Sequence, residues 1–123
     1  MLVKSHRGLD VYKIAFNTAL EIFDVSKSFP KEEKYSLTDQ IRRSSRSVCA
    51  NIAEGYRKRR YEKSFVSKLS DSEAEAGETQ VWLEFALAHG YISKNLFDQL
   101  FDKYEHIISM LVKMQNNAKK WSF

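Results

Sequence analysis

Apolar side chains recur every three or four residues in four stretches of the chain, which is the spacing that places them on one face of an α-helix. They predict helices over residues 9–28, 37–56, 61–89 and 94–118. The four core-facing stripes consist of Leu9, Tyr12, Phe16, Ala19 and Phe23 (flanked by Val11, Ala15, Ile22 and Val25); of Leu37, Ile41, Ser44, Val48, Ile52 and Gly55; of Phe65, Leu69, Ser72, Ala76, Thr79, Leu83 and Ala86; and of Phe97, Leu100, Tyr104, Ile107, Leu111 and Met114.

Residues that interrupt or cap helices lie between these stretches. Pro30 ends the first helix, because proline disfavours a helical conformation in the preceding residue. Ser36 is expected to cap the second helix, Gly55 to end it in a left-handed conformation, Gly90 to end the third, and Ser93 to cap the fourth. Four helices joined by short connections predict an all-α fold, an antiparallel up-down-up-down four-helix bundle in one domain over residues 1–123.

The third predicted helix carries a second stripe, about 120° to 140° around from the first. It consists of Val66, Ser70, Ala74, Gly77, Val81, Phe85 and Ala88. Mostly small side chains let another helix approach closely, so two interpretations are open. Either both stripes lie inside one bundle, or the second is a homo-oligomer interface centred on Val66, Ala74, Gly77, Val81 and Phe85.

Charge is divided unevenly along the chain. The 123 residues include 20 Lys and Arg against 16 Asp and Glu, a net charge of +4, but residues 1–70 carry +7 and residues 71–123 carry −3. Arginine suits phosphate because its planar fork bonds two oxygens at once. The sequence therefore suggests an RNA or DNA phosphate surface, the other interpretation being a solvated helix face. The proposed nucleic-acid-binding residues are Arg42, Arg43, Arg46, Arg57, Arg59 and Arg60.

Tyr56 and Tyr61 flank the basic turn between the second and third helices. Both would either stack on unpaired bases or cover the end of the bundle.

No pattern of catalytic residues is present. The single cysteine, Cys49, lies in a helix among apolar residues, where a buried small side chain is the default. Asp71, Glu75 and Glu78 share one helix face and would bind a hard metal ion, remain solvated, or pair with the basic second helix. The three histidines lack metal-ligand spacing, and no Gly-rich phosphate loop occurs. We therefore expect a non-enzymatic protein without cofactor or bound metal.

Two further features bear on the compartment. No apolar run reaches the roughly 20 residues that span a bilayer, and the first ten residues lack the apolar core of a signal peptide. A single cysteine cannot form an internal disulfide, which suits a reducing environment. A cytoplasmic protein with no membrane partner is expected.

Several segments carry a family resemblance: Leu9–Lys13, Phe29–Ser44, Ser47–Gly55 (Ser-Val-Cys-Ala-Asn-Ile-Ala-Glu-Gly), Glu78–Leu83 and Gly90–Ile92. Together they resemble the bacterial four-helix-bundle family encoded by 23S rRNA intervening sequences, and its relative, the accessory variability protein of diversity-generating retroelements. The resemblance implies a homopentamer with a basic exterior that binds nucleic acid and, in the retroelement relatives, a reverse transcriptase. Where other members carry small residues in the third helix, this chain has the acidic segment Asp71–Gly77.

Within the Asn-Ile-Ala-Glu-Gly segment, Asn51 and Glu54 lie close to the core stripe and would need partners if buried. Arg43 or Arg46, from the same helix or from a neighbouring chain, would supply them, and the segment is interpreted as shaping the helix end and subunit contacts. The leading functional hypothesis is a homo-oligomeric bundle that binds structured RNA or other nucleic acid through its arginines. The alternative is a protein-interaction scaffold that docks an acidic partner such as a reverse transcriptase.

Overall fold

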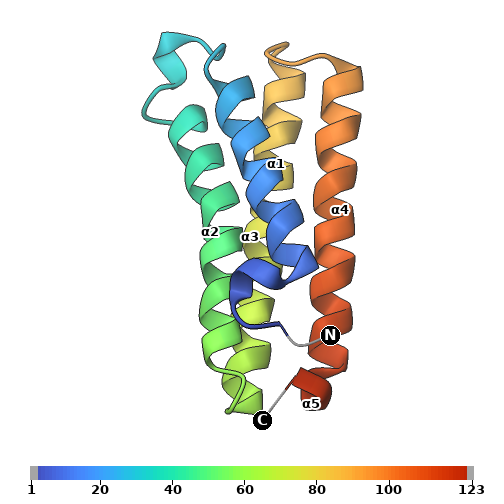
Figure 1. The fold of residues 1–123 in the computed structure, drawn as a ribbon. Coiled ribbons are helices and arrows are strands. Elements are labelled where there is room, and N and C mark those ends of the chain that lie inside the picture. Colours follow the sequence, from blue (N-terminus) through green and yellow to red (C-terminus); the bar gives the residue numbers. More distant parts are fainter. Residues whose placement is uncertain (1–2, 122–123) are drawn as a thin grey trace.

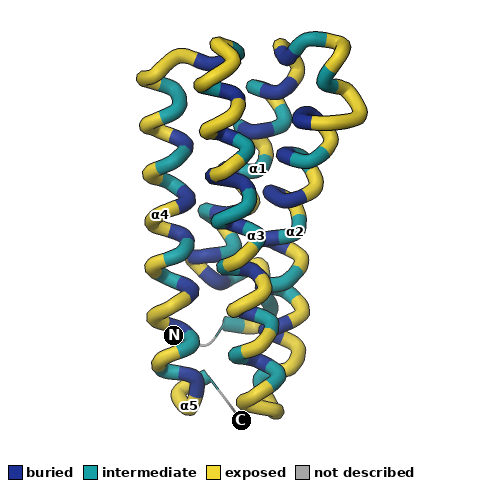
Figure 2. The backbone as a smooth tube through the Cα atoms, turned by 180° about the vertical axis from the view of Figure 1, so that it is seen from behind, coloured by how far each residue is buried: buried dark blue, intermediate teal, exposed yellow. Residues whose placement is uncertain are grey.

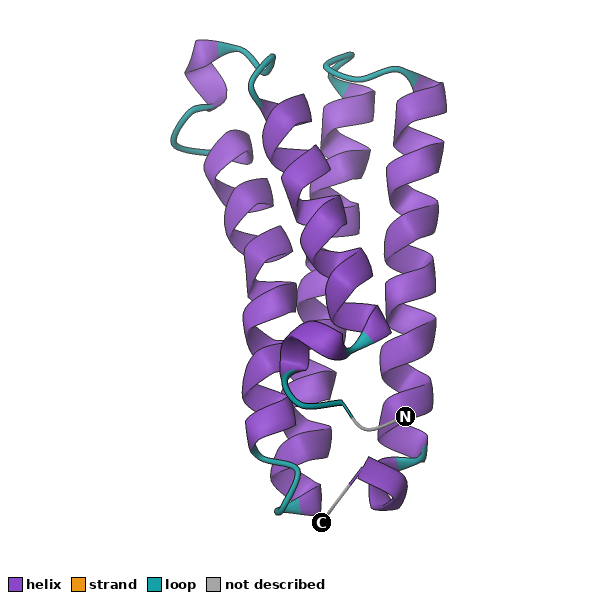
Figure 3. Ribbon diagram, viewed as in Figure 1, coloured by secondary structure: helices purple, strands orange, loops and turns teal. Residues whose placement is uncertain are grey.

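Four long helices run side by side along the length of the molecule in the computed structural model, which describes residues 3–121 (Figure 1). They are α1 (Asp10–Ser26), α2 (Leu37–Arg57), α3 (Glu62–Ala88) and α4 (Lys94–Asn116). Helices consecutive in the chain are antiparallel neighbours, and α1 also contacts α4, so α1 and α3 occupy opposite corners. Residues 3–121 contain no strand (Figure 3). The predicted all-α four-helix bundle is confirmed.

Three short elements were not expected from the sequence: η1 (His6–Gly8), η2 (Lys31–Glu33) and α5 (Ala118–Trp121). The first long helix ends at Ser26, two residues before the predicted end, and the fourth ends at Asn116 before the separate turn of α5. The element η1 packs against α1 and α2, and α5 packs against α3 and α4. Each short element therefore covers part of the bundle that the long helices leave open.

The buried side chains form one core between the four helices (Figure 2). The predicted stripes of α2 and α3 are buried throughout, and that of α4 is buried except for the half-buried Phe97. The stripe predicted for α1 does not match the face that is buried. The flanking residues Val11, Ala15 and Ile22 are buried, whereas Phe16 of the stripe is 46% exposed. No helix within residues 3–121 is both long enough and apolar enough to cross a membrane.

Small residues bring α2 and α3 close together. The hydroxyls of Ser44 and Thr79 share a hydrogen bond of 2.8 Å, and Ser72 Oγ donates to the Val48 carbonyl at 2.8 Å. These buried hydroxyls are therefore satisfied inside the core. A Cβ at Gly55 would lie 3.3 Å from both Leu69 Cδ2 and Lys68 Cβ.

Gly55 thus permits close helix packing, and its predicted role as a left-handed cap is wrong because it lies within α2. The cap expected at Ser36 is also wrong, since no side-chain bond from Ser36 caps the helix. Instead, Glu33 Oε1 accepts hydrogen bonds from the backbone N–H of Leu37 at 3.3 Å and from Ser36 Oγ at 2.7 Å. The other two expectations are confirmed: Gly90 has φ +77° after α3, and Ser93 Oγ accepts from Leu96 N at 3.1 Å.

The second stripe of α3 lies outside the core. Ala74, Val81 and Phe85 are exposed, and Val66 and Gly77 are half-buried. The interpretation that both stripes lie inside one bundle is therefore wrong, because α2 and α4 cover only the first stripe. The face remains available to a second copy of the chain.

Candidate nucleic-acid interface

The arginines in the middle of α2 lie on two different flanks of that helix. Arg42 points towards α1, where its Nε donates to Ser26 Oγ at 2.7 Å and its guanidinium carbon lies 4.3 Å from the centroid of the Phe23 ring. Arg46 lies 5.6 Å from the same centroid. Both guanidinium groups are thus placed by an aromatic ring of α1 and remain partly or fully exposed.

Arg43 points the other way, towards α3. Its Nη1 donates to Glu75 Oε2 at 2.9 Å, and its Nη2 contacts Glu78 Oε2. Burial opposes ionisation of Glu75, but the hydrogen bond and charge of Arg43 outweigh it and lower the pKa of that carboxyl. The predicted pairing of these acids with the basic second helix is confirmed within one chain for Glu75 and Glu78. Among residues 3–121, no three acidic, histidine or cysteine side chains are grouped to hold a metal ion.

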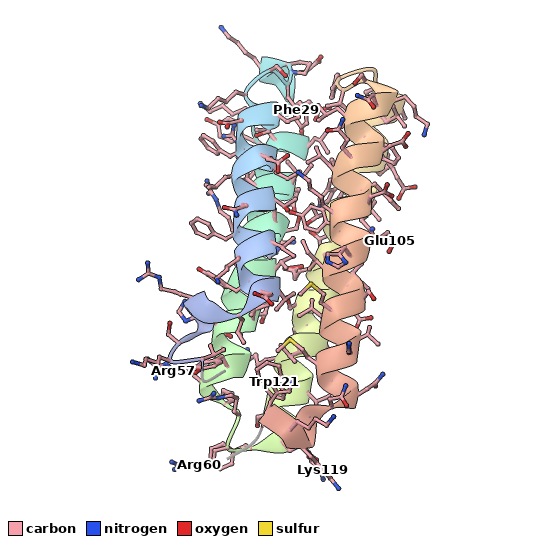
Figure 4. The ribbon with its side chains drawn as sticks, turned by 45° about the vertical axis from the view of Figure 1, so that its right-hand side comes forward. Phe29, Arg57, Arg60, Glu105, Lys119 and Trp121 are labelled. Atoms are coloured by element: carbon pink, nitrogen blue, oxygen red, sulfur yellow. The ribbon has the colours of Figure 1, made fainter. Side chains whose placement is uncertain are left out.

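The remaining predicted arginines follow the last turns of α2. Arg57 and Arg60 are exposed and extend from the same end of the bundle (Figure 4). Arg59 lies over the Tyr56 ring, 3.7 Å from its centroid. Tyr56 is buried and its hydroxyl donates to the Val3 carbonyl at 2.6 Å, whereas Tyr61 is 62% exposed. Of the two alternatives for these tyrosines, Tyr56 covers the end of the bundle and Tyr61 is accessible.

The fold brings basic residues from two other parts of the chain to the end of the bundle where α2 ends. The hydrogen bond between Tyr56 and Val3 holds the segment before α1 against α2. Glu62 at the start of α3 lines one hollow together with Lys119 and Lys120 of α5, so these two elements lie side by side. Figure 4 shows Arg60 and Lys119 at this end, both directed outward. We call the combined surface of residues 3–8, 57–63 and 117–121 the basic end.

The basic end holds nine basic residues and one acidic residue, Glu62, for a net charge of +8. Eight of the nine basic residues are exposed, and Arg59 is half-buried. The basic residues are Lys4, Arg7, Arg57, Lys58, Arg59, Arg60, Lys63, Lys119 and Lys120. In the sequence, the Lys119-Lys120 pair was the only local signal at the far end of the chain, and nothing in its spacing linked it to the turn near Arg60.

The Asn-Ile-Ala-Glu-Gly segment has other partners than predicted. Asn51 Nδ2 donates to the Ser47 carbonyl at 3.0 Å, and Glu54 pairs with Lys68 at 2.8 Å. Within one chain, Arg43 and Arg46 are therefore not the partners of these residues, because both arginines point to other flanks of the helix. The neighbouring Cys49 is buried as expected, and burial raises the pKa of its thiol to about 11.

The outward rotation of the α1 aromatic residues creates an apolar groove between α1 and α2. Tyr12, Phe16, Leu20 and Phe23 form one wall, and Arg46 and Cys49 lie on the other. The groove has a volume of about 540 Å³. It offers an apolar surface on the α1–α2 side of the bundle.

This arrangement defines a class: an all-α four-helix bundle whose charge is concentrated at one end. The chain belongs to the 23S rRNA-intervening sequence protein family, whose model matches residues 7–113. It is similar to the crystal structure of a protein with unknown function from the S23 ribosomal protein family of Bacteroides thetaiotaomicron. The two share 27% identity and a TM-score of 0.78, over 85% of this chain and 97% of that chain. The resemblance noted in the sequence is confirmed. No curated protein matches the chain significantly.

Proposed function

We propose that this protein is a non-enzymatic, homo-oligomeric bundle that binds structured RNA or other nucleic acid through its basic surface. The observation that carries the proposal is the net charge of +8 over the basic end, where eight cationic side chains are exposed. Phosphate groups dominate the affinity of nucleic-acid complexes, and each neutralised phosphate releases counterions. Binding should therefore weaken steeply with salt and depend little on sequence.

The six predicted arginines contribute unequally under this proposal. Arg57 and Arg60 extend from the basic end and contribute most, since they are exposed where the net charge is +8. Arg42 and Arg46 line the α1 side of α2 and extend the positive surface along the bundle. Arg43 contributes least, because Glu75 and Glu78 already compensate its charge.

Two apolar surfaces support a head-to-tail oligomer. One is the groove of α1, where Phe16 and Leu20 are about half exposed, and the other is the α3 stripe with Val81 and Phe85. They are different surfaces, one between α1 and α2 and the other on α3, so contact between unlike surfaces of successive copies generates a ring or a filament rather than a two-fold dimer. A ring agrees with the homopentamer that the family resemblance implies. Five copies would carry a net charge of +20.

Size-exclusion chromatography with light scattering, at low and high salt and with or without a structured RNA hairpin, tests both parts. We expect a salt-stable oligomer that binds the hairpin only at low salt. Replacing Arg57 and Arg60 with Gln should weaken hairpin binding. Replacing Lys27 and Lys94, which pair with Asp24 and Asp98 at the other end, should not. A monomer would contradict the oligomer, and a hairpin that stays unbound at low salt would contradict the nucleic-acid function.

The groove between α1 and α2 favours a second candidate function, a scaffold for an acidic protein. Its apolar wall and the cationic Arg46 suit an amphipathic helix with acidic flanks, such as a segment of a reverse transcriptase or another protein. Nuclease treatment separates the two functions. A purified partner that stays bound after nucleic acid is digested supports the scaffold, and one that is released supports nucleic-acid bridging.

A further inference from the structure

The first turn of α3 separates two hollows that are lined by lysines. Lys58, Lys63 and Lys68 line one, with a volume of about 240 Å³, and Lys68 is also paired with Glu54. Lys119 and Lys120 line the other, with a volume of about 310 Å³, together with Glu62 and Val66 of α3. The hollows lie on opposite flanks of the turn, because residues 62 and 66 share one face of the helix and residues 63, 64, 67 and 68 share another.

Tyr61 lies immediately before this turn, and the two residues that follow it line the two hollows: Glu62 lines the second and Lys63 the first. Its side chain is 62% exposed, although the neighbouring Tyr56 is buried under Arg59. An exposed aromatic ring next to cationic surfaces is the combination found in proteins that bind single strands, where phosphates follow the cations and bases stack on the ring. A duplex offers phosphates to such a surface, but its bases are already stacked on one another.

We propose that the basic end binds an unpaired segment of RNA, with one base stacked on Tyr61 and the flanking phosphates in the two lysine-lined hollows. This inference rests on the proposed nucleic-acid function and specifies the form of nucleic acid that the same surface takes. Glu62 is the one carboxylate of the basic end. It lines the second hollow together with Lys119 and Lys120, so the charge of that hollow stays positive. The strand passes from Lys63 on one flank to Lys119 and Lys120 on the other.

Fluorescence anisotropy tests the stacking contact. The probes are an unstructured RNA of about 12 nucleotides, within the site size of single-strand binders, and the same RNA in a perfect duplex. We expect Tyr61→Ala to raise the Kd for the single strand about tenfold and the Kd for the duplex less than about twofold. Tyr35→Ala is the matched control, because Tyr35 is 85% exposed at the other end of the bundle and should leave both values unchanged.

The lysines are tested by the salt dependence of the same binding. Replacing Lys58, Lys63, Lys119 and Lys120 with Gln should reduce the slope of log Kd against log salt by about 3, given about 0.7 per phosphate contact with a single strand. Circular dichroism of each variant checks that the helical signal is retained.

The outcomes separate the two proposals. A wild-type chain that binds neither RNA at low salt would contradict the nucleic-acid function itself. A chain that binds RNA while Tyr61→Ala changes nothing, or weakens single strand and duplex equally, would overturn only the stacking inference.

Discussion

The two ends of the bundle are built from similar residue types and have different electrostatic characters. At the basic end, nine basic residues face one carboxylate. At the other end, formed by residues 24–39 and 89–98 and called here the balanced end, four basic residues lie among five acidic ones for a net charge of −1. Each end also exposes a tyrosine, Tyr61 and Tyr35 respectively. Exposed lysine and tyrosine thus occur at both ends, but the basic end adds four arginines and the balanced end adds four more carboxylates.

The carboxylates of the balanced end also serve structure. Glu33 Oε1 accepts from Ser36 Oγ and from Leu37 N, and Glu33 Oε2 accepts from the Tyr91 hydroxyl at 2.8 Å. These hydrogen bonds tie the η2 turn to the start of α2 and to the connection after α3. The hydrogen bond from Ser36, followed by that from Tyr91, lowers the pKa of Glu33. The balanced end uses one of its carboxylates to connect its turns, whereas the basic end carries a net charge of +8 with a single carboxylate.

The largest expected effect separates the core beneath the basic end from its surface. Phe65, in the first turns of α3, is only 1% exposed, and Phe65→Ala should reduce the free energy of unfolding by about 3 to 5 kcal/mol. Tyr61→Ala, four residues earlier, should change it by less than about 0.5 kcal/mol. Urea denaturation of both variants measures these changes in the free energy of unfolding. A large loss for Tyr61→Ala would make that residue structural and remove the contrast.

An intermediate effect is expected at the balanced end. Glu33→Ala removes the cap of α2 and should reduce the free energy of unfolding by about 1 kcal/mol at pH 7. Because folding lowers the pKa of Glu33 from its ordinary value of 4.5, its stabilisation is present above that pH and is lost as the pH falls through the folded pKa. The wild type and the variant should therefore converge in stability towards pH 3.

The matched control for that experiment is Glu32→Ala, since Glu32 is the exposed neighbour in the same turn. It should change the free energy of unfolding little at any pH. A difference between Glu33→Ala and the wild type that persists unchanged at pH 3 would show that the charge of Glu33 is not what stabilises this end.

The smallest effect concerns Arg43, whose charge is compensated like those of the balanced end. Arg43→Gln should reduce the free energy of unfolding by about 0.5 kcal/mol, as is typical of exposed ion pairs, and a double-mutant cycle with Glu75→Gln should recover most of that coupling. The coupling should shrink at high salt. Lys58→Gln should leave stability unchanged. If Arg43→Gln and Lys58→Gln lose the same amount of RNA affinity, Arg43 belongs to the binding surface, and its ion pair with Glu75 does not reduce its contribution.

Helix α1 shows why periodicity alone did not determine its orientation. Its predicted stripe and its actual buried face both have helical spacing, and the actual face includes Thr18 and Ser26. These polar residues tolerate burial because each hydroxyl donates to a carbonyl of its own helix, Thr18 to Ile14 and Ser26 to Phe23. The aromatic residues that looked like core were left to form the groove. In α3, by contrast, the first stripe contains the large residues Phe65, Leu69 and Leu83 together with small ones, and its burial was predicted correctly.

The arginines of α2 likewise depend on the neighbouring helices for their partners. Arg42 and Arg43 are adjacent in the sequence and are separated by about 100° around the helix. They therefore meet different neighbours: Phe23 and Ser26 on one side, Glu75 on the other. Which charge is compensated depends on the helix that packs beside each flank.

The sequence by itself determined the four helices, most of their buried stripes, the positive first part of the chain and the family. These follow from local spacing and from composition, which do not depend on how the helices are arranged. Only the tertiary structure decided that the segment before α1, the turn after α2 and the short helix α5 meet at one end. The physical reason is that electrostatic potential sums over distance in space. Arg60 and Lys119 reinforce one another because packing of the helices brings them to the same end, although more than fifty residues separate them along the chain.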